Sequence, residues 1–247
     1  MHKELSRALD FIFPRRCPVC DGIIPALELR DGRLRAGGDI HPACSAKIKY
    51  VRGNTCAKCG KPLNGDSDRE YCGDCTRTAH VYDKGMSVFR YRTVAGSIYK
   101  FKYMGRREYA DFYARATKRL LGEKIKRLGV EVLIPVPMYP DKERHRGYNQ
   151  ATIYARALSR ELDIPVREDL IRRVRNTAPM KELDAVARRN NLKKAFNIPQ
   201  NDVKFKCILI VDDIYTTGST IDEIAHEFRM AGVKRIYFLT LAIGQTT

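Results

Sequence analysis

The stretch ILIVDDIYTTGST, from Ile208 to Thr220, joins an apolar run to two adjacent acids and then to a hydroxyl-rich turn around one glycine. The apolar run is typical of a strand buried on both faces, and the residues after Gly218 are typical of the start of a helix. The first turn of a helix has free backbone amides and the positive end of the helix dipole, so it favours an anion. The stretch therefore predicts a phosphate-binding turn, although it matches neither the GxxxxGK(S/T) nor the GxGxxG pattern.

The two acids, Asp212 and Asp213, need a partner other than the phosphate, because carboxylates and phosphate repel each other. Vicinal sugar hydroxyls suit them, since each carboxylate can accept a hydrogen bond from a diol. The whole stretch thus predicts a ribose 5-phosphate unit as ligand. The alternative is an ordinary helix N-terminus preceded by a solvated acid pair.

The C-terminal two thirds of the chain alternates between apolar runs and amphipathic segments, which predicts an α/β fold with a parallel sheet covered on both faces. Strands are expected at 81–91, 131–137, 207–211 and 235–243, and helices at 95–103, 108–128, 149–162, 183–195 and 219–231. Ligands of such sheets bind beyond the carboxyl ends of the strands. We therefore expect the acids and the turn after them to lie next to the segment 135–149.

Seven of the eight cysteines lie before residue 76; six of them form three pairs separated by two residues, and the seventh, Cys44, forms a fourth such pair with His41. This spacing lets a tight turn direct both ligands at one metal ion. It predicts two closed, structural zinc sites, with these ligands: Cys17, Cys20, His41 and Cys44 in the first; Cys56, Cys59, Cys72 and Cys75 in the second. Alternate pairs could instead share an ion in a cross-braced arrangement, and a redox role is a weaker alternative. Gly60 is expected to supply a positive φ after Cys59.

The formal net charge of +17 over 247 residues indicates an anionic partner, such as nucleic acid, a membrane surface or a phosphorylated substrate. A basic surface that only aids solubility is the alternative. No apolar run is long enough to span a bilayer, and the cluster at 9–13 is too short for a signal sequence. We expect a cytoplasmic protein with a zinc-binding module at 1–80 and an α/β domain at 81–247.

The stretch from Ile208 to Thr220 resembles the phosphoribosyl pyrophosphate (PRPP) motif of the type I phosphoribosyltransferases, with Tyr215 where that family often has smaller residues. Over nearly the whole chain the sequence resembles the ComF family of competence proteins. The blocks that carry this likeness are FPRRCPVC, CAKCGKPL, FKYMGRREYA, IPVPMYPDKERHRGYNQA and VDDIYTTGST. The chain departs from that family at His41, where a cysteine is common.

The resemblance implies a type I phosphoribosyltransferase fold and a set of roles. Asp212 and Asp213 would hold the ribose 2- and 3-hydroxyls. The 5-phosphate would lie against Thr216, Thr217, Gly218, Ser219 and Thr220. The segment 137–146 corresponds to the pyrophosphate loop, in which Arg144 and Arg146 would contact pyrophosphate, and Lys102 would reach the same pocket. Mg²⁺ would arrive with the diphosphate.

The resemblance also implies a DNA-uptake protein of natural transformation that binds single-stranded DNA and PRPP, with a competence helicase or other DNA-uptake proteins as further partners. One alternative is an active phosphoribosyltransferase, similar to the amidophosphoribosyltransferases, with an unknown acceptor. Another is a non-catalytic PRPP sensor. We expect zinc removal to unfold the N-terminal module and to leave PRPP binding largely intact.

Two regions could provide a surface for single-stranded DNA. One is the basic stretch 167–194, with Arg172, Arg173, Arg175, Lys181, Arg188, Arg189 and Lys193. The other is the segment 99–115, where aromatic and basic residues alternate: Tyr99, Phe101, Tyr103, Tyr109, Phe112 and Tyr113 with Lys100, Lys102, Arg106, Arg107 and Arg115. The alternative for the second region is a pair of helices with aromatic residues in the core and basic residues in water.

Overall fold

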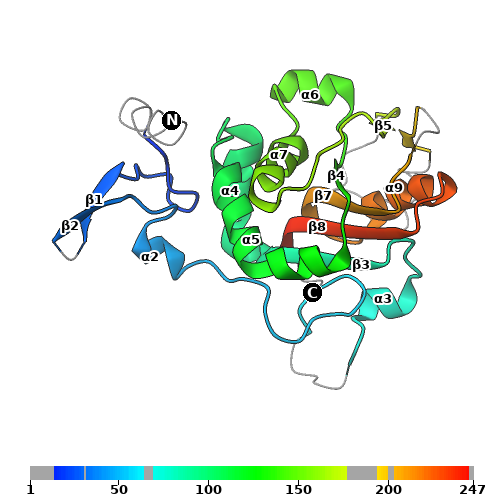
Figure 1. Ribbon diagram of the computed structural model, residues 1–247, viewed down its shortest axis with the longest axis horizontal. Helices are drawn as coiled ribbons and strands as arrows, with labels where there is room; N and C mark the ends of the chain where they lie inside the picture. The colour runs from blue at the N-terminus through cyan, green and yellow to red at the C-terminus, as the bar shows by residue number, and fades with distance from the viewer. Residues whose placement is uncertain (1–13, 31, 64–68, 177–193, 200–202, 245–247) are drawn as a thin grey trace.

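The computed structural model describes residues 14–30, 32–63, 69–176, 194–199 and 203–244 (Figure 1). Its centre is a four-stranded parallel sheet in the order β3 (Lys84–Arg90), β8 (Arg235–Ile243), β7 (Cys207–Tyr215) and β4 (Val132–Pro135). All four strands were expected from their apolar runs. The parallel sheet with helices on both faces confirms the expected fold class.

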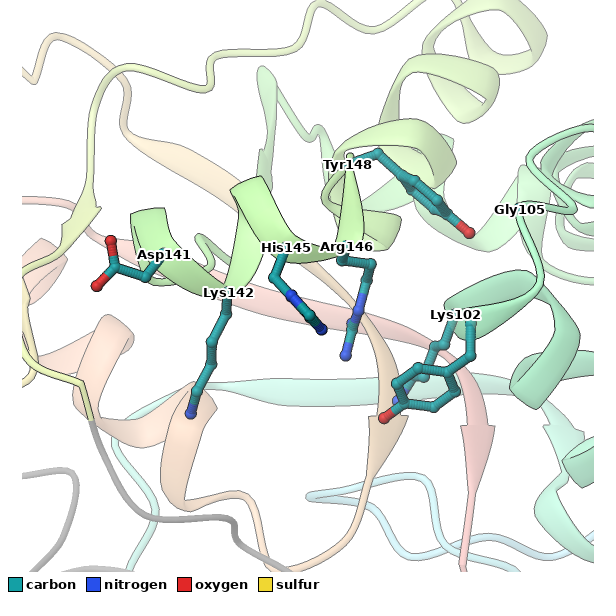
Figure 2. Close-up of a pocket in the computed structure, with 8 residues that line it drawn as sticks. Lys102, Gly105, Asp141, Lys142, His145, Arg146 and Tyr148 are labelled. Carbon is teal, nitrogen blue, oxygen red and sulfur yellow. The ribbon is translucent and has the colours of Figure 1, made fainter.

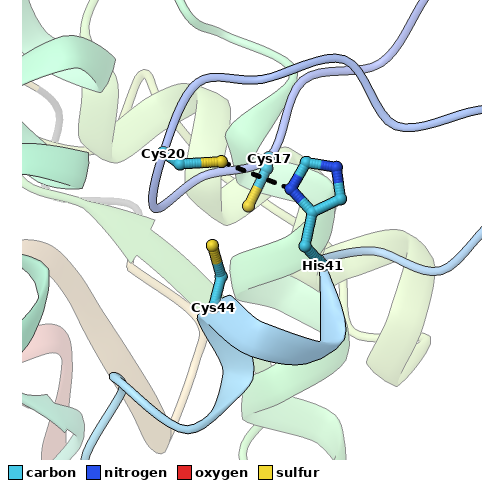
Figure 3. Close-up of side chains that lie close together, drawn as sticks. All are labelled: Cys17, Cys20, His41 and Cys44. Atoms are coloured by element: carbon cyan, nitrogen blue, oxygen red, sulfur yellow. Dashed lines mark hydrogen bonds between the residues drawn. The ribbon is translucent and has the colours of Figure 1, made fainter.

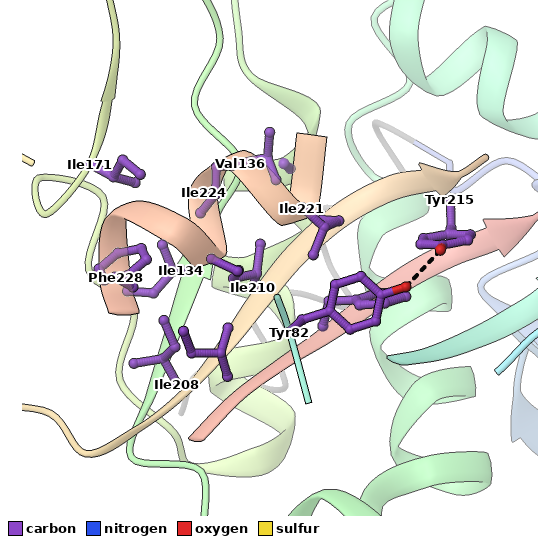
Figure 4. Packing of buried hydrophobic residues seen from close by; sticks show 14 of the residues in the cluster. Tyr82, Ile134, Val136, Ile171, Ile208, Ile210, Tyr215, Ile221, Ile224 and Phe228 are labelled. Carbon is purple, nitrogen blue, oxygen red and sulfur yellow. Dashed lines mark hydrogen bonds between the residues drawn. The ribbon is translucent and has the colours of Figure 1, made fainter. Parts of the chain in front are cut away.

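The two faces of the sheet are covered by different elements. On one face lie α4 (Tyr91–Tyr103), α5 (Tyr109–Leu128) and α7 (Gln150–Leu162), and on the other lies α9 (Ser219–Met230). Successive residues of a strand point to opposite faces. Accordingly, Leu209 packs under the first group of helices, whereas Ile208 and Ile210 pack under α9 (Figure 4).

The N-terminal region forms two small units at different places on this body. The first contains the hairpin β1 (Leu27–Arg30) and β2 (Arg33–Ala36) followed by α2 (Pro42–Ser45), and it lies beside α4 and α5. The second ends in α3 (Gly73–Arg77) and lies next to β3. We call them the first and the second ribbon.

Two local features differ from the expectations or extend them. The segment after β4, expected as a loop, contains the helix α6 (Pro140–Arg146), which starts with proline at its first position, where the missing N–H costs nothing. A two-stranded sheet of β5 (Arg172–Arg173) and β6 (Phe196–Asn197) closes the α9 side. The helix expected at 183–195 lies almost entirely outside the described residues, as does the apolar cluster at 9–13.

The described helices include none with the length and apolar character needed to cross a bilayer.

Candidate functional site

The sequence suggested that the two acids lie beyond the end of a strand at 207–211. In the structure they lie within β7, which continues to Tyr215. The pairing with β8 continues past the apolar run, with Asp212 opposite Thr240 and Tyr215 opposite Ile243. The acids therefore point to opposite faces of the sheet at its carboxyl edge. Buried Asp213 faces α4, where its carboxylate lies 2.7 Å from the ammonium of Lys102. The Asp212 carboxylate accepts a hydrogen bond of 2.8 Å from the backbone N–H of Asp213.

The two carboxylates have different electrostatic surroundings. Burial and the neighbouring charge of Asp213 raise the pKa of Asp212 to about 7, although Lys102 and Arg173 act in the opposite direction. Burial by itself would lower the pKa of Lys102, but the attraction of Asp213 and Asp212 raises it above its usual value. Lys102 is therefore charged and forms an ion pair with Asp213, and the raised pKa of Asp212 lies near neutral pH.

The turn after β7 is built for close approach of an anion. Gly218 has φ of 84° and is the N-cap of α9, so the free amides of the first helical turn face the open end of the sheet. The hydroxyls of Thr217 and Ser219 lie 2.9 Å apart on the same turn. A side chain at position 218 would meet the Tyr215 hydroxyl at 2.7 Å. Glycine is thus required for both its backbone conformation and its lack of a side chain.

Next to this edge is a cavity of about 450 Å³ between α4 and α6 (Figure 2). Its lining is rich in cations from both helices and consists of Lys102, Tyr103, Gly105, Asp141, Lys142, His145, Arg146 and Tyr148. Burial together with the charges of Arg173 and Arg146 lowers the pKa of Lys142. Such crowding of positive charge favours an anionic ligand, because an anion relieves the repulsion between the cations.

The two arginines predicted for pyrophosphate take different positions. The side chain of Arg146 enters the cavity, where its guanidinium lies 4.7 Å from the centre of the Tyr103 ring and donates to Gln150. The side chain of Arg144 is 79% exposed, pairs with Asp141 and does not line the cavity. Lys142 and His145, which were not predicted, line it instead. The signal for them is helical spacing: in a helix, residues 142, 145 and 146 share one face.

The cysteines and His41 gather in two groups. In each group all four ligand atoms lie within 4.8 Å of one another, and the members are Cys17, Cys20, His41 and Cys44 in the first and Cys56, Cys59, Cys72 and Cys75 in the second (Figure 3). Consecutive pairs thus share a centre, and the cross-braced arrangement is not formed. Gly60, with φ of 75°, has the positive value expected after Cys59.

The first group fits a zinc ion with three sulfurs and one nitrogen. His41 Nε2 lies 2.9 Å from the carbonyl oxygen of Ile23, to which it can donate, while Nδ1 faces Cys20 Sγ at 3.3 Å. A carbonyl acceptor on one ring nitrogen is the usual way in which a metal-binding histidine presents the other. The backbone N–H of Gly22 also points to Cys20 Sγ, at 3.4 Å.

The second group fits a zinc ion with four sulfurs. The Cys72 N–H lies 3.3 Å from Cys56 Sγ, and Cys59 Sγ lies 3.6 Å from Cys72 Sγ. Hydrogen bonds with the Cys56 sulfur raise the pKa of Cys75 to about 12. Crowded thiols resist the loss of several protons, and a divalent cation removes that resistance. Both centres have four protein ligands, which is the pattern of structural zinc.

Comparisons with known proteins agree with this organisation. Residues 8–76 match the double zinc ribbon domain, and residues 149–246 match the phosphoribosyl transferase domain. The fold is thus that of a phosphoribosyltransferase joined to an N-terminal double zinc ribbon. A purine phosphoribosyltransferase from Pyrococcus horikoshii Ot3 aligns with a TM-score of 0.35 and 26% identity, over 53% of this chain and 73% of that chain.

The relatives define the family. Competence protein F of Haemophilus influenzae is 33% identical over 224 residues, which cover 85% of this chain and 95% of that protein. Competence protein ComFC of Bacillus subtilis is 28% identical and covers 72% of this chain and 73% of its own length. DNA utilization protein YhgH of Escherichia coli (strain K12) is 29% identical, with shares of 69% and 75%. The chain belongs to the ComF family of competence proteins.

Proposed function

We propose that the protein binds PRPP, accompanied by Mg²⁺, at the carboxyl edge of its sheet, and that it serves in the handling of DNA during uptake. The observation that carries the PRPP part is the arrangement at this edge. The acid pair and the glycine turn adjoin at the end of β7, and Lys102 both pairs with Asp213 and lines the cation-rich cavity.

Each part of PRPP has a matching part of the site. The 5-phosphate would accept hydrogen bonds from the amides and hydroxyls of residues 216–220. The ribose diol would donate to Asp212 and Asp213, and the diphosphate would lie in the cavity near Arg146 and Lys142. A guanidinium suits a phosphate because its planar fork can donate two parallel hydrogen bonds. Positioning and charge neutralisation are the main contributions that such a site makes to transfer chemistry.

The PRPP assignment is tested by changing both acids to amides. The variant Asp212→Asn/Asp213→Asn keeps the shape of the side chains but removes the charges that accept from the diol, so PRPP binding measured by calorimetry should be lost. The matched control is Asp111→Asn/Asp169→Asn, which changes the net charge equally at two exposed positions. Equal affinity in the wild type and the site variant would refute the assignment.

The names of the relatives, competence protein and DNA utilization protein, support a role with DNA for this chain. The structure reduces the proposed aromatic surface for single strands to one end of α4. Four of the six aromatic residues are buried in the core, as in the alternative of two ordinary helices: Phe101, Tyr109, Phe112 and Tyr113. The other two, Tyr99 and Tyr103, are 58% and 54% exposed. Their rings lie 5.1 Å apart.

We propose that Tyr99 and Tyr103 stack on bases of single-stranded DNA while neighbouring cations hold its backbone. The variant Tyr99→Ala/Tyr103→Ala should bind an oligothymidine more weakly by about thirtyfold or more, since each of the two stacked bases contributes roughly 1–3 kcal/mol. Tyr99→Phe/Tyr103→Phe should bind normally, and so should Tyr71→Ala, which changes an exposed tyrosine of the second ribbon. Affinity equal to that of an unrelated protein of the same charge, with the same salt dependence, would contradict DNA binding.

Two further functions use the same PRPP pocket. An active phosphoribosyltransferase would release pyrophosphate in the presence of an acceptor, whereas a sensor would bind PRPP without consuming it and pass the signal to a partner such as a helicase. A pyrophosphate-release assay with nucleobases, amines and single-stranded DNA as acceptors separates them.

A further inference from the structure

The second ribbon is part of the body and not a separate appendage. The backbone N–H of Gly85, in β3, donates to the carbonyl of Lys58 at 2.7 Å, inside the loop between Cys56 and Cys59. A side chain on Gly60 would lie 2.7 Å from the carbonyl oxygen of Gly85, so the two backbones touch. The sulfurs of the second cluster belong to the same hydrophobic core as β7 and α9.

A set of buried rings connects this ribbon to the phosphate-binding turn. The hydroxyls of Tyr82 and Tyr215 lie 2.7 Å apart (Figure 4). Both rings also pack on Phe238, Tyr215 face to face at 4.8 Å and Tyr82 edge-on at 4.7 Å. Tyr215 is the last residue of β7, and its hydroxyl lies directly against Gly218. The large side chain at 215 thus fills the space between the ribbon and the turn.

Residues 80–81, which follow the second ribbon, also contact the first turn of α9. The ring of His80, which is 1% exposed, stacks on Tyr82, and its Nδ1 lies 2.6 Å from one carboxylate oxygen of Asp222. The backbone N–H of Val81 donates to the other oxygen of Asp222 at 2.9 Å. Both oxygens are therefore held from the side of residues 80–81. These two contacts engage the acid in the first turn of α9, the turn whose backbone amides would receive a phosphate.

The first ribbon is attached in another way. Asp21, next to Cys20, forms an ion pair of 2.9 Å with Arg106 and accepts a hydrogen bond from Tyr109, and Asp39 pairs with Arg115 at 2.7 Å. These contacts reach α5 and the loop before it, on the opposite face from α9. A change in the first ribbon therefore has no direct contact route to residues 216–220 among those the structure describes.

We propose that His80 is a positioning residue for the phosphate-binding turn, through which zinc in the second cluster, but not in the first, sets the order of residues 216–220 and their affinity for a phosphate group. The affinity part rests on the proposed PRPP function, whereas the ordering part does not. Under this proposal, the expectation that zinc removal leaves PRPP binding intact applies to the first cluster only. Removal of zinc from the second cluster should weaken PRPP binding.

The His80 contact is tested with three single variants. His80→Ala removes the donor to Asp222, and His80→Asn restores it, because the asparagine amide occupies the place of Nδ1. His80 Nε2 has no hydrogen-bond partner in the described part of the chain, so asparagine loses nothing that the ring nitrogen used. The control is Asp83→Ala, which removes the ion pair of Asp83 with Arg229 at the other end of α9.

The readouts are amide hydrogen exchange of residues 216–220 by mass spectrometry and binding of PRPP and of inorganic phosphate. His80→Ala should speed exchange of the turn and weaken PRPP binding about tenfold, equivalent to about 1.4 kcal/mol. His80→Asn should restore both, and Asp83→Ala should change neither. Unchanged exchange in His80→Ala, failure of the asparagine rescue, or an equal effect of Asp83→Ala would each overturn the proposal.

The metal part is tested with Cys56→Ser/Cys59→Ser against Cys17→Ser/Cys20→Ser, each in the full chain. Exchange at residues 216–220 should rise only in the first of these variants. Equal exchange in both variants would overturn the coupling, and if either variant fails to fold, the His80 series decides. If the wild type binds no PRPP, the proposed function fails, while the exchange measurements still decide whether His80 orders the turn.

Discussion

Asp212 and Asp213 are neighbours in sequence, yet they meet different charges because a strand sends them to opposite faces. Asp213 is neutralised by Lys102 at 2.7 Å, whereas Asp212 is left with a pKa raised to about 7 by burial and by Asp213. In the folded protein Asp212 keeps its proton at pH values where the unfolded chain has lost it. Raising the pH from about 4 to 7 therefore reduces its contribution to stability.

A pH dependence of ligand binding follows from the same pKa. The diol needs an ionised carboxylate as acceptor, so PRPP affinity should rise as the pH increases from 6 to 8, with most of the change around pH 7. The phosphate groups of PRPP also titrate in this range, and Asp212→Asn separates the two effects. Calorimetry across this range should show a smaller pH dependence in Asp212→Asn. The same pH profile in both proteins would contradict the role of Asp212.

Two glycines at opposite ends of α9 allow the cost of backbone strain to be compared with the cost of steric crowding when each is replaced by alanine. Gly218 and Gly232 both have a positive φ, of 84° and 91°, but only Gly218 has atoms close to where a side chain would be. Gly232→Ala should lower the free energy of unfolding by about 1 kcal/mol and leave ligand binding unchanged. Gly218→Ala should cost roughly 1–3 kcal/mol and weaken phosphate binding, because Tyr215 must move. Urea unfolding and calorimetry measure both, and equal costs would argue against crowding.

At the scale of elements, α6 decides which of its cations face the site. The helix turns Lys142, His145 and Arg146 toward the cavity and leaves Arg144 on the outer side, paired with Asp141. A loop of the same sequence would give no reason to prefer one arginine over the other. The N-terminal proline and the left-handed Gly147 at the end bound the helix at both sides.

This orientation predicts different effects for two arginines of one helix. Arg146→Ala should weaken binding of magnesium pyrophosphate by about tenfold or more, since a charge-assisted contact contributes about 1.5–3 kcal/mol. Arg144→Ala should change it by less than about twofold, as expected for an exposed charge. Calorimetry of both variants with pyrophosphate provides the comparison, and a larger loss in Arg144→Ala would show that α6 presents its other face.

At the scale of the whole molecule, the two ribbons are attached to the body in different ways. The second shares a hydrophobic core with the sheet, whereas the first combines packing of Val19 and Ile40 on the core under α4 and α5 with the ion pairs Asp21–Arg106 and Asp39–Arg115. Hydrophobic packing is insensitive to moderate salt, whereas ion pairs at the surface are screened by it. The division of the chain at residue 80 stays a prediction, and the shared core argues that the second ribbon folds with the α/β domain.

The two ribbons should therefore respond differently to salt. Between 0.1 and about 1 M NaCl, amide exchange of the first ribbon should increase, while that of the second should stay nearly constant. Arg106→Ala/Arg115→Ala should produce the same loosening of the first ribbon at low salt. Equal salt responses of the two ribbons, with zinc retained, would contradict a contribution of the ion pairs to the attachment of the first ribbon.

The strands and helices of this fold could be predicted because each is marked by residues that are neighbours in the sequence. The apolar runs before Pro135 and Asp212 mark strands, and Asn149 marks the start of a helix whose Ala151 amide it caps. The cysteine spacing identified the ligands of both metal centres for the same reason. Strand β7 was predicted too short, because two acids interrupt its apolar run and the residues after Val211 are held in the sheet by their pairing with β8.

By itself, the sequence determined the fold class, the membership of the ComF family, the two groups of side chains that could hold a metal ion, and the glycine turn that begins α9. Each of these features depends on a few neighbouring residues or on the short spacing between paired residues. Tertiary structure alone decided that Lys102 pairs with Asp213, that Arg146 and not Arg144 enters the cavity, and that His80 reaches Asp222. These contacts join residues far apart in the chain, and their geometry depends on how helices and ribbons pack on the sheet.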